Sequence, residues 1–364
     1  MNDHGTTAVI DLNALRNNID VIKKMAPNSK ILAMVKRNAY GHGAVKISQI
    51  LEKENKANTF GVACLNEAIT LHDAGIKTPI LMLKGFVDAE ELKIIDKYKF
   101  ATLIHNNEQL DILEKTKLNN PLTVWLKIDS GMHRLGFQKN LAENAYKRLM
   151  NNEQVTKPLF LMTHMSDADS PEKPKTANQL KAFAEITANF QGLKTIANSA
   201  TIITHKEAHA DVVRPGITMF GVSPFADKTV LEYGFQPVMT LESTLIAIQH
   251  LAKGETVGYG STWTAPEEMR IGIVNTGYGD GYPRTSKTPP MVMINNKKGP
   301  LVGRVAMDML NVDLRTIPEA KVGDRVTLWG KGLPIEEVAS HLGTVPYELF
   351  CQLTQRVIYK YINE

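Results

Sequence analysis

The sequence has few of the features that mark secreted, membrane-spanning or disulfide-rich proteins. It contains only two cysteines, Cys64 and Cys351, so a disulfide framework is excluded. Both lie in apolar segments, which predicts small buried side chains in a reducing compartment. The first seven residues are polar and form no apolar signal core, and no segment has the roughly 18 to 20 apolar residues that cross a bilayer. These absences predict a cytoplasmic protein with no membrane partner.

Dense charge and ligand clusters are also missing. The 42 Lys and Arg against 38 Asp and Glu give a formal net charge of +4, and no basic run indicates a nucleic-acid partner. No His/Cys/Asp spacing is typical of a metal site. The glycines of residues 277–281 have neither the spacing nor the strand–helix context of a dinucleotide fingerprint. What remains, 43% hydrophobic and 22% charged residues, is the composition of an ordinary globular protein.

Short apolar runs alternate with helical patterns over the first two-thirds of the chain. Helical patterns such as those at 11–25, 66–74 and 177–189 provide the crossovers that parallel strands require. The runs are continuously apolar, as expected of strands covered on both faces. We therefore predict an α/β fold with an N-terminal (β/α)8 TIM-like barrel over residues 8–233. Its strands are expected at 31–35, 59–64, 79–83, 100–105, 122–128, 159–164, 193–197 and 211–220.

The pattern changes after about residue 233. Short strand-like runs follow, separated by Gly and Pro, with one helical pattern at 335–341. We predict a smaller, mostly β C-terminal domain over residues 234–364, joined by an N-terminal strand within residues 1–10. Its strands are expected at 239–248, 270–274, 290–294, 301–305 and 325–329.

Polar side chains gather where the predicted barrel strands end. Lys36 closes the first strand, and a lysine amine there can bond covalently to the aldehyde of pyridoxal 5′-phosphate (PLP). The carboxyl ends of barrel strands share one face, where active sites form. Each residue alone also fits a structural polar group, but several on one face indicate an active site. The others at these ends are Tyr40, Lys127, Asp129, Arg134, His164, Asn198, Ser199 and Arg214.

Taken together, these segments resemble the alanine racemases, PLP-dependent enzymes with a barrel and a C-terminal β domain. The resemblance implies a cytoplasmic isomerase that interconverts L-alanine and D-alanine and supplies D-alanine for peptidoglycan. It also implies PLP as cofactor and a homodimer with shared active sites. The matching motifs run in order over nearly the whole chain, at 35–43, 129–136, 198–200, 213–216, 258–260, 277–283 and 303–308.

The resemblance assigns a role to each matching residue. Lys36 carries PLP and is one of two bases, and Tyr259, supplied by the partner subunit, is the other. Arg214 faces the pyridine nitrogen, to which an arginine does not readily give a proton. The further cofactor contacts are Tyr40, His164, Asn198, Ser199, Gly216 and Ile217. The substrate contacts are Arg134, Met307, Lys127 and Tyr278, with Arg284 at the entrance.

Three positions qualify the resemblance. Lys127 shares a strand face with Trp125 and Asp129, and a cation there beside Arg134 would be costly, whereas family members often carry a carbamate on this lysine. Many members have tyrosine where this chain has Gln355, and some have histidine where it has Thr195. A broad-specificity racemase, a PLP decarboxylase of the same fold and a non-catalytic PLP-binding protein stay open as alternatives. So does the choice between a biosynthetic and a catabolic role.

Overall fold

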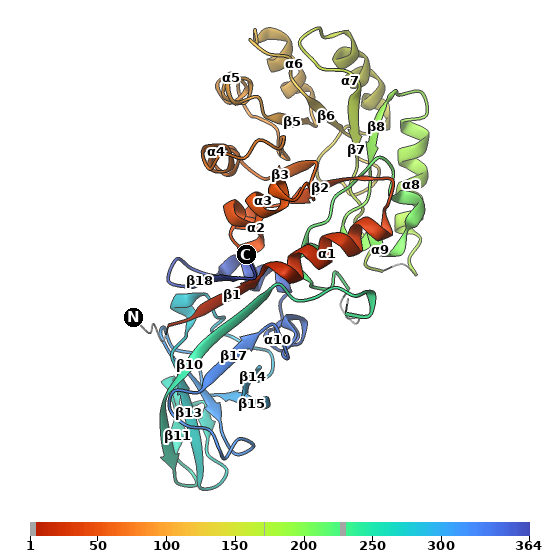
Figure 1. Cartoon of the computed structure of the whole chain (residues 1–364). Helices are drawn as coiled ribbons and strands as arrows, with labels where there is room; N and C mark the ends of the chain where they lie inside the picture. Colours follow the sequence, from red (N-terminus) through yellow and green to blue (C-terminus); the bar gives the residue numbers. More distant parts are fainter. Residues whose placement is uncertain (1–4, 171, 226–230) are drawn as a thin grey trace. The chain divides into compact units, whose positions relative to one another are not determined.

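The computed structural model describes residues 5–170, 172–225 and 231–364, which form two compact units (Figure 1). The barrel unit consists mainly of residues 19–219. The β unit consists of the residues up to 18, residues 220–223 and the chain from 231 onward. Residues 1–4 of the predicted N-terminal strand lie outside the described part.

The barrel unit is a closed barrel of eight parallel strands. Each strand pairs with the next along the chain, and the last pairs with the first, with Lys30 opposite Val212. The predicted fold is therefore confirmed. The strands are β2 (Lys30–Met34), β3 (Thr59–Val62), β4 (Ile80–Met82), β5 (Ala101–Ile104), β6 (Val124–Lys127), β7 (Leu159–Met162), β8 (Gly192–Thr195) and β9 (Val212–Val213).

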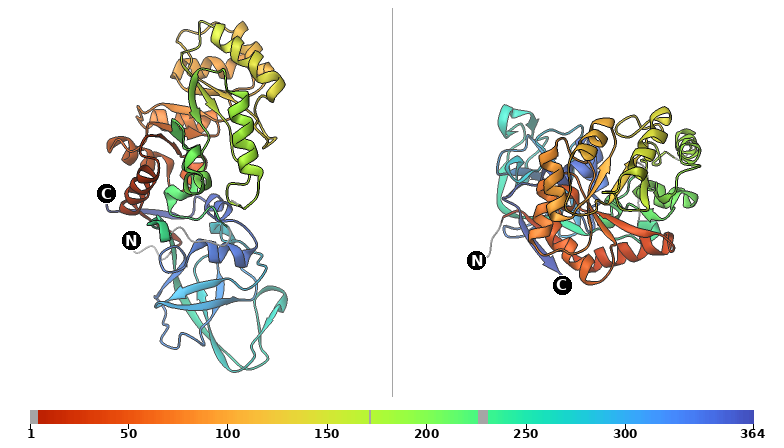
Figure 2. Two further views of the ribbon diagram at one scale, coloured as in Figure 1. Left: turned by 90° about the vertical axis from the view of Figure 1, so that its right-hand side faces the viewer. Right: turned by 90° about the horizontal axis from the view of Figure 1, so that it is seen from above.

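Helices surround these strands, as the view from above shows (Figure 2). Side-chain caps fix several helix starts: Asp88 accepts a hydrogen bond of 2.8 Å from the N–H of Glu91, and Asn106 one of 2.9 Å from that of Gln109. The longer helices are α3 (Ala44–Lys53), α4 (Leu65–Asp73), α5 (Ala89–Tyr98), α6 (Asn107–Lys115), α7 (Lys139–Asn151) and α8 (Lys175–Ile186), and α1 (Leu12–Met25) precedes the first strand. Short helical segments are α2 (Lys36–Gly41), α9 (Ser199–Thr204), η1 (Lys206–Ala208) and η2 (Ile217–Phe220).

The eighth barrel strand is much shorter than the predicted 211–220. Only Val212–Val213 pairs in the sheet, and the chain then turns into η2. Pro215 has no N–H for a sheet ladder, so the strand ends before it. The end of the strand thereby becomes a loop that starts at Arg214.

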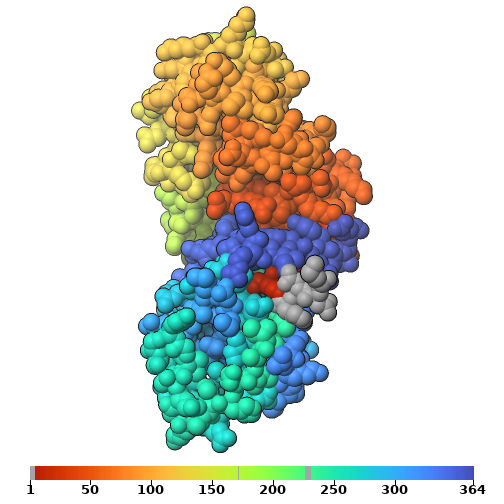
Figure 3. Space-filling view, turned by 90° about the vertical axis from the view of Figure 1, so that its left-hand side faces the viewer, coloured from red at the N-terminus to blue at the C-terminus, as the bar shows by residue number. Residues whose placement is uncertain are grey.

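The β unit contains an eight-stranded sheet in the order β13-β16-β15-β14-β17-β10-β1-β18. Because β13 also pairs with β10, six of these strands close into a ring. The C-terminal segment (blue) and teal segments of this unit share one face, with a small patch of N-terminal residues (red) beside them (Figure 3). The strands are β1 (Thr7–Asp11), β10 (Met239–Leu251), β13 (Met269–Val274), β14 (Met291–Ile294), β15 (Lys297–Val302), β16 (Leu310–Asp313), β17 (Arg325–Trp329) and β18 (Ile358–Ile362).

The β unit holds more regular structure than the sequence predicted. The two-stranded pair β11 (Thr256–Val257) and β12 (Trp263–Thr264), the strands β16 and β18, and a second helix, α11 (Pro346–Gln352), were not expected. These segments are short or only half-buried, so their apolar pattern is weak. The predicted helix is α10 (Ile335–Leu342). Three 3₁₀ turns complete the unit: η3 (Leu231–Tyr233), η4 (Tyr259–Ser261) and η5 (Tyr278–Asp280).

The prediction that both cysteines are buried is wrong. Cys64 is exposed, because it stands at the N-cap of α4 where the chain has already left β3, and Cys351 is partly exposed on α11. Within the described residues, no helix is long and apolar enough to span a bilayer. The cytoplasmic location stays a prediction.

Candidate active site

Lys36 follows β2 and begins a turn of unusual backbone conformation. The next four residues, Arg37 to Tyr40, have φ between 52° and 55°, so the chain makes a left-handed helical turn. Left-handed geometry costs non-glycine residues about 1–2 kcal/mol each, because Cβ approaches the following carbonyl oxygen. Such strain persists only where surrounding contacts hold it, and it gathers at functional sites.

Side chains from the turn and from α4 hold this conformation. The carboxylate of Glu67 accepts hydrogen bonds of 2.7 Å from the N–H groups of both Arg37 and Ala63. The side-chain oxygen of Asn38 accepts one of 2.8 Å from the N–H of Ala44 and so ties the turn to α3. Lys36 is therefore placed by a fixed loop and not by a flexible strand end.

Tyr40, Ser199 and Gly216 meet beside this turn. A Cβ added to Gly216 would lie 2.7 Å from the Tyr40 hydroxyl, so only glycine leaves room for it. Ser199 Oγ accepts hydrogen bonds from the N–H of Gly216 at 2.9 Å and from the Thr218 hydroxyl at 3.0 Å. Because these donors occupy its lone pairs, the Ser199 hydroxyl is left to donate its own hydrogen, as an anion requires.

Ser199 and its neighbours are themselves fixed. Asn198 caps α9, accepting from the N–H of Thr201 at 3.0 Å and donating to the carbonyl of Met165 at 3.2 Å. Ile217 begins η2 directly after Gly216, so the N–H of Ile217 stands at the start of a helical turn. Hydroxyls and N–H groups in this arrangement suit a phosphate dianion.

Arg214 lies in a buried network of neutral acceptors. Its side chain donates to the Thr195 hydroxyl at 2.7 Å, to the Thr163 carbonyl at 2.7 Å and to the Ile196 carbonyl at 3.1 Å. Its Nη2 also lies 3.3 Å from His164 Nδ1, which must then be the acceptor. Burial lowers the pKa of Arg214 to about 9, so the guanidinium stays protonated near neutral pH.

The pKa of His164 is affected by the nearby cations of this face. Burial, followed by the charges of Arg214, Lys127, Arg134 and Lys36, lowers its pKa well below the ordinary histidine value. Lys36 follows β2, Lys127 ends β6 with Arg134 in the loop after it, and Arg214 follows β9, so these four residues come from three different strands. That these residues form one active site stays a prediction.

Lys127 ends β6 and is buried, with 7% of its surface exposed. Burial, followed by the charges of Arg214 and Arg134, lowers the pKa of its amine well below the ordinary value. Arg134, by contrast, is exposed in the loop after β6. Asp129 shapes that loop by accepting hydrogen bonds of 3.0 Å from the N–H groups of Gly131 and His133.

The remaining predicted residues lie in loops of the β unit, and their side chains are exposed. The exposed fractions are 69% for Tyr259, 40% for Tyr278 and 52% for Met307. The loops of Tyr278 and Met307 are joined, because the N–H of Gly279 donates to the Met307 carbonyl at 2.8 Å. Exposed aromatic and methionine side chains on fixed loops are typical of a surface that contacts a partner.

Comparison with known proteins accounts for both units. Residues 10–224 match the model of the alanine racemase N-terminal domain, and residues 238–361 match that of the alanine racemase C-terminal domain. The chain belongs to the alanine racemase family. It is thus an isomerase, and the alternatives of a decarboxylase and of a non-catalytic PLP-binding protein lose their support.

Named relatives within the alanine racemase family cover nearly the whole chain. Alanine racemase of Coxiella burnetii is 46% identical over 356 residues, which is 96% of this chain and 97% of that protein. The biosynthetic alanine racemase of Pseudomonas aeruginosa has a TM-score of 0.93 at 41% identity, covering 98% of this chain and 99% of that one. That of Bartonella henselae, solved with covalently bound pyridoxal phosphate, has a TM-score of 0.88 at 27% identity over 98% and 99% of the two chains.

The barrel face fits the cofactor of the alanine racemase family. The Tyr40 hydroxyl, which packs against Gly216, together with the Ser199 hydroxyl and the N–H group that begins η2, suits the phosphate of PLP. A protonated arginine and a lysine on the same face suit its ring nitrogen and its aldehyde. Among the described residues no group of three His, Cys, Asp or Glu side chains is placed to hold a metal ion.

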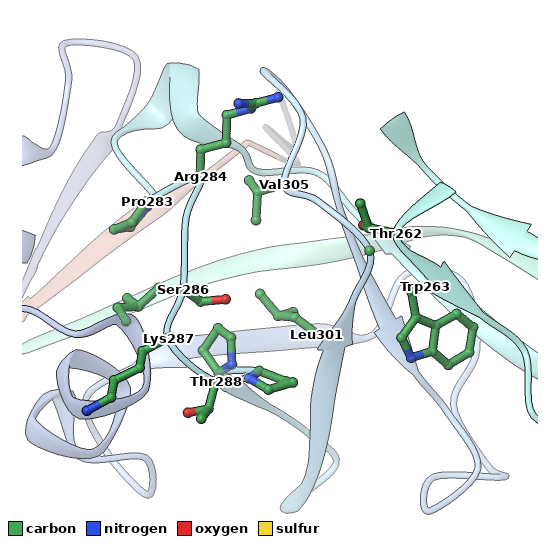
Figure 4. Close-up of a pocket in the computed structure, with 13 residues that line it drawn as sticks. Thr262, Trp263, Pro283, Arg284, Ser286, Lys287, Thr288, Leu301 and Val305 are labelled. Atoms are coloured by element: carbon green, nitrogen blue, oxygen red, sulfur yellow. The ribbon is translucent and has the colours of Figure 1, made fainter. Parts of the chain in front are cut away.

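Arg284, predicted at the entrance, lines a separate pocket of about 220 Å³ in the β unit (Figure 4). Ser286, Leu301 and Val305 also line it. The Lys287 amine points away from the other labelled side chains, so its charge does not converge with that of Arg284. The pocket therefore lacks the convergent polar groups of a small-molecule site.

Both departures from the alanine racemase pattern have a defined place. Thr195 is fully buried and bonds to Arg214, where a histidine was expected in some members. Gln355 is exposed in the segment after α11. That segment is tied to the Tyr278 loop, because the Thr354 hydroxyl donates to the Gly279 carbonyl at 2.8 Å and Arg356 Nε lies 3.5 Å from Asp280.

Some residues that shape the site gave little signal in the sequence. Glu67 lies 31 positions after Lys36 on an ordinary amphipathic helix, so only the structure shows that it holds the turn. Thr163 contributes through its backbone carbonyl, which any residue possesses. His42 stands in a motif that matches the family, but the motif alone does not say what its ring contacts.

Replacing Thr195 with valine tests the network behind Arg214. The Thr195 hydroxyl accepts from Arg214 at 2.7 Å and also lies 2.8 Å from the Val212 carbonyl, to which it donates. We expect Thr195→Val to lower the free energy of unfolding of the PLP-free protein by about 2–3 kcal/mol, since it leaves buried polar groups unsatisfied. Urea denaturation measures this change. Thr195→Ser, which keeps the hydroxyl, is the control, and equal losses in both variants would show that the hydrogen bond contributes little.

Proposed function

We propose that this chain interconverts L-alanine and D-alanine with PLP, with Lys36 and Tyr259 as the two bases. The observation that carries the proposal is that Lys36, Lys127 and Arg214 follow or end barrel strands, with Lys127 and Arg214 buried and Arg214 within 3.3 Å of His164. Packing alone does not explain several buried or half-buried cations in one place. A cofactor and a substrate that both carry anionic groups do explain them.

PLP, when bound, withdraws electrons from the substrate and makes its Cα–H acidic. The Tyr40 and Ser199 hydroxyls and the N–H group of Ile217 would hold its phosphate, beside Gly216, whose own N–H donates to Ser199 Oγ. Lys36 would hold the aldehyde carbon of PLP, and its amine would act as a base on one face of the substrate Cα. Arg214 would face the ring nitrogen and, being protonated near neutral pH, would donate a hydrogen bond to it without readily giving up its proton.

The substrate carboxylate lies toward Arg134, with the N–H of Met307 as a second donor. The lowered pKa of Lys127 favours its neutral amine, which is the form that adds to CO2. We infer that Lys127 forms a carbamate, with loss of one proton, whose negative charge orients Arg134. In protein equilibrated with ¹³C-bicarbonate, a carbamate carbon signal that is lost in Lys127→Ala tests this.

Tyr259 is the second base and comes from a second copy of this chain. Its side chain is 69% exposed on a loop of the β unit, whereas Lys36 lies in the barrel unit. Glycines with φ of 72° and 76° flank it, and they fix the loop in a conformation that other residues rarely adopt. A homodimer in which each barrel face receives Tyr259, Tyr278 and Met307 from the other subunit covers these side chains.

Mixing two inactive variants tests the shared site. Equal amounts of Lys36→Ala and Tyr259→Phe chains, unfolded and refolded together, should recover up to about one quarter of wild-type activity. Half of the dimers are mixed, and each mixed dimer has one intact site. Racemisation is measured after the mixed dimers have been verified with affinity tags.

A matched control uses the double variant Lys36→Ala/Tyr259→Phe. Refolded with an equal amount of wild-type chain, it should leave about one quarter of the activity if the sites are shared, but about one half if each subunit holds a complete site. The second value, or no recovery in verified mixed dimers, would contradict the shared site.

The substrate itself is tested by following both enantiomers chromatographically. With PLP added, the purified protein should convert L-alanine into D-alanine with the highest kcat/KM among the common amino acids. Comparable values for several amino acids would favour the broad-specificity racemase. Release of CO2 in place of the other enantiomer would indicate a decarboxylase and refute the proposal.

A further inference from the structure

His42 is a buried side chain with no part in the chemistry proposed above. It stands at the end of the left-handed turn, after Tyr40 and Gly41, and none of its surface is exposed. A buried titratable side chain beside a strained segment is a feature that stability alone rarely explains.

The ring of His42 contacts the backbone of the turn. Its Nδ1 lies 2.8 Å from the Tyr40 carbonyl oxygen and 3.1 Å from that of Ala39. Carbonyl oxygens only accept hydrogen bonds, so Nδ1 carries the hydrogen and donates to both. Burial lowers the pKa of the ring to about 4, so it is neutral near pH 7 and keeps this tautomer.

These contacts fix the direction of two peptide groups. In the left-handed turn the carbonyls of Ala39 and Tyr40 both face the ring. Rotation of either peptide toward the ordinary right-handed conformation would turn its carbonyl away from Nδ1 and lose the bond. Backbone bonds of the same turn, from the N–H of Ala39 to Val35 at 2.8 Å and from that of Gly43 to Asn38 at 3.0 Å, link its ends.

We propose that His42 is a positioning residue, which locks the left-handed turn and thereby sets where the Lys36 amine and the Tyr40 hydroxyl lie. The inference rests on the proposed assignment of these two groups to PLP. Lys36 lies within the turn that the hydrogen bond from the N–H of Ala39 to the carbonyl of Val35 closes. The Tyr40 hydroxyl packs against Gly216, where no Cβ could be accommodated. A turn that reverses would therefore move both groups together.

Two isosteric substitutions separate the hydrogen bond from packing. In His42→Asn the side-chain N–H is attached to Cγ, as Nδ1 is in histidine, so it can donate to the same carbonyls. His42→Asp has the same shape, but an acceptor replaces the donor. His209→Leu is the matched control, because His209 is another buried histidine of the barrel unit that bonds to a backbone carbonyl, that of Ile202 at 2.8 Å.

Hydrogen–deuterium exchange of the PLP-free protein measures the turn directly. In His42→Asp the amides of Ala39 and Gly43 should exchange on the order of 10- to 100-fold faster than in the wild type, while strand amides such as that of Phe60 change little. His42→Asn should restore most of the protection. PLP affinity, measured separately by fluorescence quenching, should fall about 10-fold or more in His42→Asp and return toward the wild-type value in His42→Asn.

Unchanged exchange in His42→Asp, an equal change at these amides in His209→Leu, or no difference between Asn and Asp would each overturn the inference. If His42→Asp does not fold, protection of the turn in His42→Asn at the wild-type level still supports the inference, and its loss refutes it. The exchange does not depend on PLP. Failure of wild-type protein to bind PLP would therefore refute the proposed function, whereas the exchange data would still test the role of His42 in the turn.

Discussion

Lys36→Ala is expected to reduce racemisation in both directions by more than about 10⁴-fold, because one substitution removes both the attachment of PLP and one base. Lys36 begins a turn whose backbone is held by Glu67 and Asn38, so alanine should be accommodated without loss of the fold. Activity is measured from each enantiomer. In parallel, borohydride reduction followed by peptide mapping locates the residue that carries the pyridoxyl group.

Lys84→Ala provides the control for this experiment. Lys84 also follows a barrel strand, β4, but its side chain is exposed, and the recorded contacts of this residue to His105 and Gln109 use its backbone carbonyl. This variant should keep wild-type activity and the label on Lys36. A pyridoxyl group mapped to another lysine in the wild type, or normal turnover by Lys36→Ala, would refute the assignment.

Tyr259→Phe is expected to lower net racemisation about 10²- to 10⁴-fold while sparing one half-reaction. Phenylalanine keeps the ring of an exposed side chain and removes only the hydroxyl, so folding should not change. With Tyr259 as the base for L-alanine and Lys36 as the base for D-alanine, the variant should still exchange the Cα proton of D-alanine. Incorporation of solvent deuterium at Cα, followed for each enantiomer by mass spectrometry, measures this.

The outcome distinguishes two bases from one. Exchange from D-alanine should persist well above exchange from L-alanine in Tyr259→Phe, and Tyr233→Phe, another exposed tyrosine of the β unit, should behave like the wild type. Equal losses for both enantiomers would mean that a single base serves both faces of Cα.

The barrel was predictable from the sequence because its strands are continuous apolar runs, whose ends fall at polar residues. The boundary of the last strand was not, since Pro215 ends the pairing within an apolar segment. The left-handed turn was also hidden. Arg37 to Tyr40 include no glycine, and their conformation is imposed by contacts with Glu67 and His42. Apart from His164, the partners of Arg214 are backbone carbonyls and a threonine, which carry no sequence pattern.

The pairing of β1 with β18 constrains the order in which the parts of the protein can fold. Thr7 lies opposite Ile358 in the parallel pair, and β1 is bounded on its other side by β10. During translation the N-terminal strand leaves the ribosome first, yet both of its neighbours are synthesised only after the whole barrel sequence. Since domains fold as units as they emerge, the barrel has time to form while β1 waits unpaired. The β unit, and with it any assembly through Tyr259, is completed only after the last strand has been released.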